Sequence, residues 1–357
     1  MNGILNIIAA GGCGISIADK VVNSVAELGE GFATVNIKYI DTSDNNIKEI
    51  KHDPKDFFMV TTKSTTGKVI AGAGGERNSK VTGDVVINTK EFLDKYKFIK
   101  PVTNDFNIVI FSAGGGSGSN IGSLLVKDML ERDIPTIAIV VGDSSNGLAA
   151  ENTFKVLDGL NKMTRAMKKS LSIFYINNDT INNSISKAKK DEVFLSVNEK
   201  EKLVNKQIFN LLTGISLFTS GVNESLDYKD MENFISPHLF STIKMPAGLY
   251  NIILSNSLSA LPNGLTVMMA RSLSDGTPIN LEGVFLQTHK SGRVVLENAL
   301  ETYKDKFPLF LVSGVNMLDS EVVHLDKVIG NIKNIANSVV VSDIDSGGEA
   351  NEYGLIL

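Results

Sequence analysis

The chain has one cysteine, no long apolar run and no excess of positive charge, and each of these absences excludes some classes of function. Its single cysteine, Cys13, excludes an internal disulfide and a cysteine-rich metal site. The four histidines lack the spacing of metal ligands. No uninterrupted apolar stretch approaches the roughly 20 residues that a membrane helix needs. The N-terminal MNGILNIIAAGG has no basic start, so we expect no signal peptide, no membrane span and a cytoplasmic protein.

The formal net charge of -5 argues against direct binding to nucleic acid or to an anionic membrane, since both require a positive face. The composition, 43% hydrophobic and 21% charged, is that of an ordinary globular protein. A length of 357 residues exceeds one typical core, so we expect two domains.

In the first half of the chain, short apolar runs alternate with segments of helical periodicity, as in Ser16–Leu28. This alternation predicts βαβ units and a parallel sheet. The predicted strands are Ile4–Ala10, Phe32–Ile40, Asn107–Ala113, Thr136–Val141 and Leu171–Asn177.

The alternation of short apolar runs with helical segments ends near Asn198. Residues Glu199–Phe218 predict one long helix that is apolar around most of its surface and therefore buried between layers. Strand-like runs at 251–257, 265–273 and 307–315, mixed with helical patterns, predict a smaller α+β domain. The predicted divisions are 1–197 for the first domain, 198–220 for the central helix, 221–342 for the second domain and 343–357 for an acidic tail.

Three glycine-rich stretches follow or precede the predicted strands: Ala9–Ser16, Ala71–Asn78 and Ala113–Asn120. Ligands of open parallel sheets bind beyond the carboxyl ends of the strands. Glycines let backbone N–H groups approach a phosphate, and a helix N-terminus adds a favourable dipole. Ser117 and Ser119 can donate hydroxyl hydrogen bonds to the same oxygens. These stretches therefore predict a phosphate-binding site.

Two familiar nucleotide motifs do not fit fully. The Walker pattern fails because Val69 stands where Ser or Thr is required. The dinucleotide fingerprint is partial: Gly12 and Gly14 fit, Ile17 replaces the third glycine, and Asp41 follows the second strand as a ribose acceptor would. An NAD-dependent Rossmann oxidoreductase remains an alternative, although it has no evident use for the later glycine loop.

The ordered set of motifs carries a resemblance. GGGSGS (114–119) is similar to the signature loop of the tubulin/FtsZ superfamily, and GGCGIS (11–16) to its first nucleotide loop. With GAGGERN (72–78), VVGDSSNGL (140–148), SLDYKDMENFI (225–235) and the acidic tail, the chain most resembles phage-encoded tubulins of the PhuZ type. The resemblance implies a Rossmann-like GTPase domain, a long central helix and a smaller α+β domain.

The resemblance also implies GTP or GDP and Mg²⁺ as ligands. It places the α- and β-phosphates on the first loop, the phosphates and metal near the second, the γ-phosphate on the third, and the guanine edge on the central helix. The ribose-side acid is Asp143 or Glu151, and Ser16 and Asp19 stand near where relatives carry an asparagine. The implied binding residues are Gly11, Gly12, Cys13, Gly14, Asp41, Thr42, Gly72, Gly74, Gly75, Asn78, Gly114, Gly115, Gly116, Ser117, Gly118, Ser119 and Asn205.

Asp227 and Asp230 match the acidic loop that promotes hydrolysis in this family. Most of the long helix separates them from Asn205, and about 20 helical residues span about 30 Å. If Asn205 and the two aspartates act on the same GTP, they come from different subunits stacked head to tail. Such a contact does not close, so it makes a filament. A helix cap is the alternative explanation for these two aspartates.

The resemblance implies a head-to-tail homopolymer with lateral protofilament contacts, whose GTPase is switched on by assembly. Its implied task is to position phage DNA, a compartment or capsids in the cytoplasm of an infected bacterium. The acidic tail is expected to dock on a neighbouring subunit, with plain disorder as the alternative. A TubZ-like DNA-segregation filament and a nucleotide-binding filament without turnover also fit the motifs and stay open.

Overall fold

The computed structural model describes residues 3–27, 32–48, 50–60, 88–98, 105–169, 171–178, 196–218, 247–251, 265–269, 311–314 and 329–330. Within these ranges, the structure has no helix long and apolar enough to cross a membrane.

The main sheet contains seven parallel strands in the order β3-β2-β1-β4-β5-β6-β7. The chain therefore winds outward from β1 in one direction and from β4 in the other, which is the doubly wound arrangement. The strands are β1 (Ile4–Ala10), β2 (Thr34–Asp41), β3 (Phe57–Met59), β4 (Phe106–Ser112), β5 (Ile137–Gly142), β6 (Leu171–Asn177) and β7 (Ala247–Asn251).

The five strands predicted for the first half are confirmed, with ends that differ by at most two residues. The short strand β3 was not predicted, because three residues are too few to show a period. Strand β7 was not predicted, and the strand predicted at 251–257 lies, apart from Asn251, outside the described residues. β7 pairs with β6, so the main sheet takes a strand from beyond the long helix. The domain boundaries themselves stay a prediction.

The described helices are α1 (Gly11–Ile17), α2 (Asn23–Ala26), α4 (Thr89–Lys95), α5 (Ser117–Glu131), α6 (Gly147–Met167) and α8 (Val197–Phe218). One π-helical turn, η1 (Ala18–Val22), joins α1 to α2, and a 3₁₀ turn, η2 (Pro54–Asp56), precedes β3. The helix expected to begin at Ser16 begins at Gly11, so the first glycine loop is its first turn. Glycine permits this because Gly11 adopts a positive φ of 71° directly after the strand.

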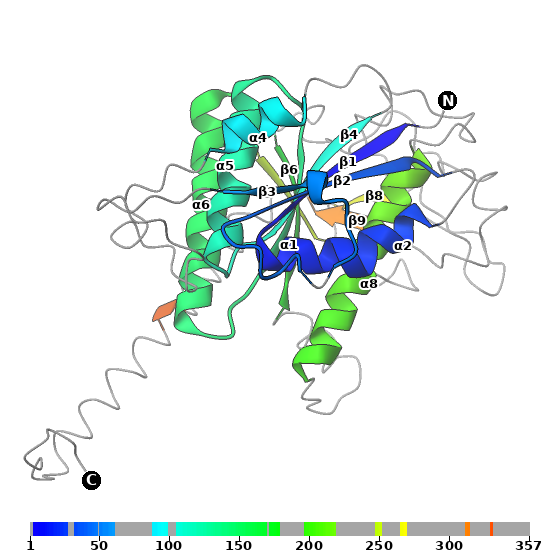
Figure 1. The fold of residues 1–357 in the computed structure, drawn as a ribbon. Helices are drawn as coiled ribbons and strands as arrows, with labels where there is room; N and C mark the ends of the chain where they lie inside the picture. Colours follow the sequence, from blue (N-terminus) through cyan, green and yellow to red (C-terminus); the bar gives the residue numbers. More distant parts are fainter. Residues whose placement is uncertain are drawn as a thin grey trace, which may run out of the picture.

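Helices cover both faces of the sheet. Figure 1 shows α4, α5 and α6 on one side and α1, α2 and α8 on the other. The core on the first side joins strand residues such as Ile8, Val109 and Val140 to helix residues such as Leu125 and Leu157, all fully buried. This packing holds the carboxyl ends of the strands in fixed positions.

The long predicted helix is confirmed as α8, and several of its apolar residues are buried. Ile208, Leu211, Leu212 and Ile215 are fully buried. Downstream, β8 (Leu265–Met269) and β9 (Leu311–Gly314) form a separate antiparallel pair, which confirms the described parts of the strands predicted at 265–273 and 307–315.

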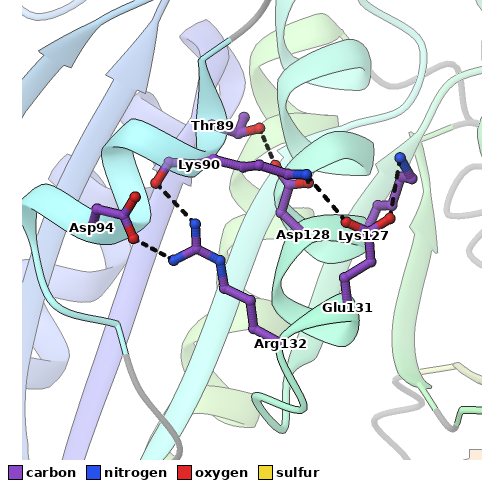
Figure 2. Close-up of polar contacts among 7 residues, drawn as sticks. All are labelled: Thr89, Lys90, Asp94, Lys127, Asp128, Glu131 and Arg132. Carbon is purple, nitrogen blue, oxygen red and sulfur yellow. Dashed lines mark hydrogen bonds and ion pairs between the residues drawn. The ribbon is translucent and has the colours of Figure 1, made fainter.

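A polar cluster holds α4 on α5 (Figure 2). Thr89 is buried and donates to the buried carboxylate of Asp128. Arg132 joins the carboxylate of Asp94, at 2.5 Å, to the backbone carbonyl of Lys90, at 3.3 Å. Because α5 begins at the GGGSGS loop, this cluster anchors α4 to the helix that carries that loop.

Candidate functional site

The carboxyl ends of β1 and β4 lie where the direction of winding reverses, and we call the region beyond them the crevice. Open α/β sheets bind their ligands at this point. Two of the predicted glycine loops follow these strands, and they touch. A Cβ added at Gly11 would lie 2.5 Å from the Cα of Gly118. Only glycine permits this approach, so the backbones of the two loops pack closely against each other.

Helix α5 opens into the crevice from the loop Gly114–Gly116. Its N-cap, Gly116, offers no side-chain hydrogen bond, and its first turn holds no acidic residue. The first N–H groups of a helix have no partner within it. They and the helix dipole therefore favour an anion at this point.

The two serines of this loop have different surroundings. The hydroxyl of Ser117 is hydrogen bonded to that of Thr42, with 2.8 Å between the oxygens. Ser119 is fully buried, and its hydroxyl donates to the carbonyl of Gly116 at 3.0 Å. The hydroxyl of Ser119 therefore stabilises the first turn of α5, and its contact with a phosphate stays a prediction.

The end of β2 adds the second predicted loop to the same crevice. Asp41 is 1% exposed and accepts hydrogen bonds from the backbone N–H of Thr42 at 2.7 Å and from Asn46 Nδ2 at 2.8 Å. Burial raises the pKa of Asp41 above its ordinary value, and the bonds from Asn46 and Thr42 oppose that rise. Thr42 is hydrogen bonded to Ser117, so the second loop contacts the signature loop, GGGSGS (114–119).

Cys13 is a free, partly buried thiol in the first loop. Burial, followed by the charges of Glu201 and Asp143, raises its pKa from 9.0 to about 12. A thiol of that pKa is protonated at neutral pH, and the thiolate is the nucleophile. Cys13 therefore fits a packing position beside the phosphate loop rather than a catalytic one.

Of the two candidate ribose-side acids, the structure brings Asp143 closer to the crevice. A Cβ added at Gly114 would lie 2.7 Å from the Cβ of Asp143. The carboxylate of Asp143 accepts from the N–H of Ser145 at 2.8 Å. Glu151 lies on α6 and pairs with Lys155 at 2.9 Å.

Helix α8 approaches the crevice through its N-terminal half. Glu201 pairs with Lys20 of η1 at 2.5 Å, and its charge acts on Cys13. Asn205 is half-buried and lies one turn further along, on the same side of the helix as Glu201. The predicted base-reading residue is thus carried by the helix that borders the first loop.

Six predicted residues lie outside the described ranges, and their roles stay predictions: Gly72, Gly74, Gly75, Asn78, Asp227 and Asp230.

The prediction missed two asparagines. Asn46 lies against Gly12, because a Cβ at Gly12 would come within 2.8 Å of its Nδ2. The polar run DTSDNN directly after a buried strand was a usable signal for it. Asn152 is almost fully buried in α6 and donates to the carbonyl of Gly114 at 3.0 Å. Nothing in the sequence marks Asn152, since 38 residues separate it from that glycine.

The model of the tubulin/FtsZ family GTPase domain matches residues 4–186, just over half of the chain. The chain belongs to the tubulin/FtsZ family. The matched region contains β1 to β6 and every glycine loop, so the crevice lies in the family's GTPase domain.

Curated relatives of this tubulin/FtsZ family member are phage proteins. It is 31% identical over 204 residues to the phage tubulin-like protein of Pseudomonas phage 201phi2-1, covering 54% of this chain and 56% of the relative. It is 26% identical to the phage tubulin-like protein of Pseudomonas phage PhiPA3, covering 56% of this chain and 53% of the relative. The chain thus spans about half the length of the curated relatives it matches.

Solved structures match over almost the whole chain and show the same fold. The protofilament of TubZ from bacteriophage PhiKZ has a TM-score of 0.61 at 17% identity and covers 99% of both chains. The phage tubulin PhuZ in complex with GDP has a TM-score of 0.60 at 16% identity, again over 99% of both chains. The tubulin/FtsZ fold predicted from the motifs is confirmed.

Proposed function

We propose that this chain binds GTP with Mg²⁺ in the β1–β4 crevice and hydrolyses it in a head-to-tail filament of its own subunits. One observation carries the proposal: two glycine loops meet at the switch point of a parallel sheet, within the GTPase domain of the tubulin/FtsZ family. The Rossmann oxidoreductase loses its support, because the partial fingerprint belongs to that GTPase domain.

In this proposal the backbone N–H groups of Gly11–Gly14 and of the first turn of α5 hold the phosphates. The third loop, with Gly72, Gly74, Gly75 and Asn78, senses the terminal phosphate, and Asn205 on α8 reads the guanine edge. The contacts between the first, second and signature loops support this division of roles, since they place three of the four loops around one crevice.

The residues of the crevice fit an Mg²⁺ ion whose ligands would come mainly from the nucleotide. In the described part of the chain, no three His, Cys, Asp or Glu side chains gather as a metal cage. The paired hydroxyls of Thr42 and Ser117 offer the oxygen ligands that Mg²⁺ prefers when phosphates supply the rest. The ion would neutralise charge on the phosphates during hydrolysis.

We assign the hydrolytic acids, Asp227 and Asp230, to the neighbouring subunit. From Asn205 to the end of α8 at Phe218, the helix rises about 20 Å, and both aspartates lie still further along the chain. A nucleotide that meets Asn205 would therefore take its water-polarising acids from the next subunit. The solved structures of a TubZ protofilament and of a PhuZ201 filament support self-assembly for a chain of this fold.

The cellular task follows from the phage origin of the curated relatives. We propose that the filaments position phage DNA, a compartment or capsids in the host cytoplasm. We also propose that the acidic tail 343–357 docks on a neighbouring subunit to strengthen assembly.

Nucleotide selectivity tests the proposed ligand. Purified protein, freed of bound nucleotide, should bind a fluorescent GDP analogue with Mg²⁺ present, and unlabelled GTP should displace it. ATP and NAD at the same concentrations should not. Displacement by NAD but not by GTP would contradict the proposal and revive the oxidoreductase.

A further inference from the structure

Asp41 is a buried carboxylate whose two oxygens are both occupied. Oδ1 accepts from the backbone N–H of Thr42 at 2.7 Å and lies 3.4 Å from its hydroxyl. Oδ2 accepts from Asn46 Nδ2 at 2.8 Å. Only 1% of Asp41 is exposed, so the bonds within this network satisfy the carboxylate in place of water.

The two partners of Asp41 reach two different glycine loops. The Thr42 hydroxyl is hydrogen bonded to Ser117 in the loop that opens α5. Asn46 lies against Gly12 in the loop that opens α1. One carboxylate therefore sets the positions of two side chains, one beside the first loop and one beside the loop that opens α5.

Asn46 has the chemistry of a phosphate ligand. Its carboxamide nitrogen carries two hydrogens, and the bond to Asp41 uses one. The residue is exposed, and its Nδ2 lies 2.8 Å from where a Cβ of Gly12 would be. The remaining N–H is therefore held at the loop whose backbone faces the phosphates.

We propose that Asn46 binds the nucleotide by donating its second N–H to a phosphoryl oxygen on the first glycine loop. Asp41 is then a positioning residue, which orients Asn46 and Thr42 without touching the nucleotide. This inference rests on the proposed GTP site and revises the expected role of Asp41. A carboxylate in direct contact with phosphates would repel them, and Asp41 is only 1% exposed.

An exchange of the two side chains separates positioning from simple stability. In Asp41→Asn, an amide must face two donors with one oxygen, so one hydrogen bond is lost in either orientation. In the double variant Asp41→Asn/Asn46→Asp, the amide at 41 can donate to a carboxylate at 46. The contact is restored in the opposite direction, but a negative charge now lies beside Gly12.

The first measurement is unfolding by denaturant without nucleotide, for wild type, Asp41→Asn, Asn46→Asp and the double variant. We expect both single variants to unfold at lower denaturant, and the double variant to recover most of that loss. Strictly additive losses would contradict the Asp41–Asn46 contact. The unfolding measurement tests the Asp41–Asn46 contact even if the wild type binds no guanine nucleotide. Absence of guanine-nucleotide binding would refute the proposed function instead.

The second measurement is the dissociation constant of a fluorescent GDP analogue with Mg²⁺. Asn46→Ala should weaken binding about tenfold, the value of one charge-assisted hydrogen bond. The matched control is Asn45→Ala, its exposed neighbour, whose Oδ1 meets Lys48 Nζ at 3.5 Å. Binding by the control should stay within about twofold of wild type.

The double variant decides between the two roles. We expect it to recover stability yet bind the GDP analogue at least about tenfold more weakly than wild type, because a carboxylate at 46 repels phosphate. If the double variant binds as tightly as wild type, or if Asn46→Ala equals its control, Asn46 does not contact the nucleotide and the inference is wrong.

Discussion

At the scale of the residue, the glycines of the crevice differ in what surrounds them. A Cβ at Gly14 would lie 2.4 Å from the backbone carbonyl of Ile110, which cannot move without disturbing β4. The three atoms nearest to a Cβ at Gly12 all belong to the end of the Asn46 side chain, which can turn away. The same substitution should therefore have different consequences at positions two residues apart.

We expect Gly14→Ala to lower the free energy of unfolding by about 1–3 kcal/mol, as overpacking does. Gly12→Ala should destabilise the protein less than Gly14→Ala, by about 1 kcal/mol for the disturbed Asn46–Asp41 hydrogen bond, and should weaken nucleotide binding by displacing Asn46. Gly159→Ala on α6 is the control, since a Cβ there meets nothing within 4 Å. Denaturant unfolding and a nucleotide titration measure both effects. Equal losses of stability at positions 12 and 14 would contradict the packing described.

The raised pKa of Cys13 gives a pH prediction. A shift from 9.0 to about 12 leaves about a thousandfold less thiolate at any pH below 9. Because the pKa is raised, alkylation of folded protein by iodoacetamide should be slow at pH 8 and should climb about tenfold per pH unit through pH 10. Mass spectrometry follows the reaction, with denatured protein as the control. A rate for folded protein that levels off near pH 9 would show an ordinary thiol.

At the scale of the element, the α4–α5 contact combines a buried hydrogen bond with exposed ion pairs. Asp128 is 4% exposed and depends on Thr89 as a donor, whereas the Lys90 side chain that approaches it at 3.9 Å is 65% exposed. An unsatisfied buried carboxylate is costly, and exposed pairs contribute little. The buried bond should therefore dominate.

We expect Thr89→Val, which keeps the shape and removes the hydroxyl, to destabilise the protein by about 2 kcal/mol. Lys90→Ala should cost about 0.5 kcal/mol or less. Urea unfolding of the two variants beside wild type makes the comparison. The opposite ranking would mean that the exposed pairs hold α4 in place.

The elements that were predicted correctly share a strong local signal. β1 and β6 were predicted to the residue, because each is a buried apolar run bounded by polar or glycine residues. The π-turn η1 was not foreseen, because it preserves the apolar spacing of Val21 and Val25 while changing the hydrogen bonding. β7 joins the main sheet through pairing with β6, a long-range choice that a local pattern does not encode.

The site was predictable to the same degree. The glycine loops and Asp41 stand out because each follows a buried strand, and parallel topology brings such positions to one edge. The bond that occupies the hydroxyl of Ser119 and the approach of Asn46 to Gly12 depend on side-chain directions. Hydrophobic periodicity does not predict those side-chain directions, so the structure was needed to separate candidate ligand-binding residues from residues that support the loops.

At the scale of the whole molecule, most of α8 lies along the chain between Asn205, the proposed base-reading residue, and Asp227 and Asp230, the proposed hydrolytic acids. The proposed enzyme is therefore incomplete as a monomer. Asp230→Ala should assemble with GTP at the same protein concentration as wild type, but should lose hydrolysis and give more persistent filaments.

The central claim is that the hydrolytic site is built between subunits. GTP hydrolysis measured against protein concentration with Mg²⁺ present, with light scattering recorded on the same samples, tests it most directly. We predict a sharp threshold at one concentration in both signals. A specific rate that is independent of concentration, without scattering, would place all the catalytic groups in one chain and contradict the claim.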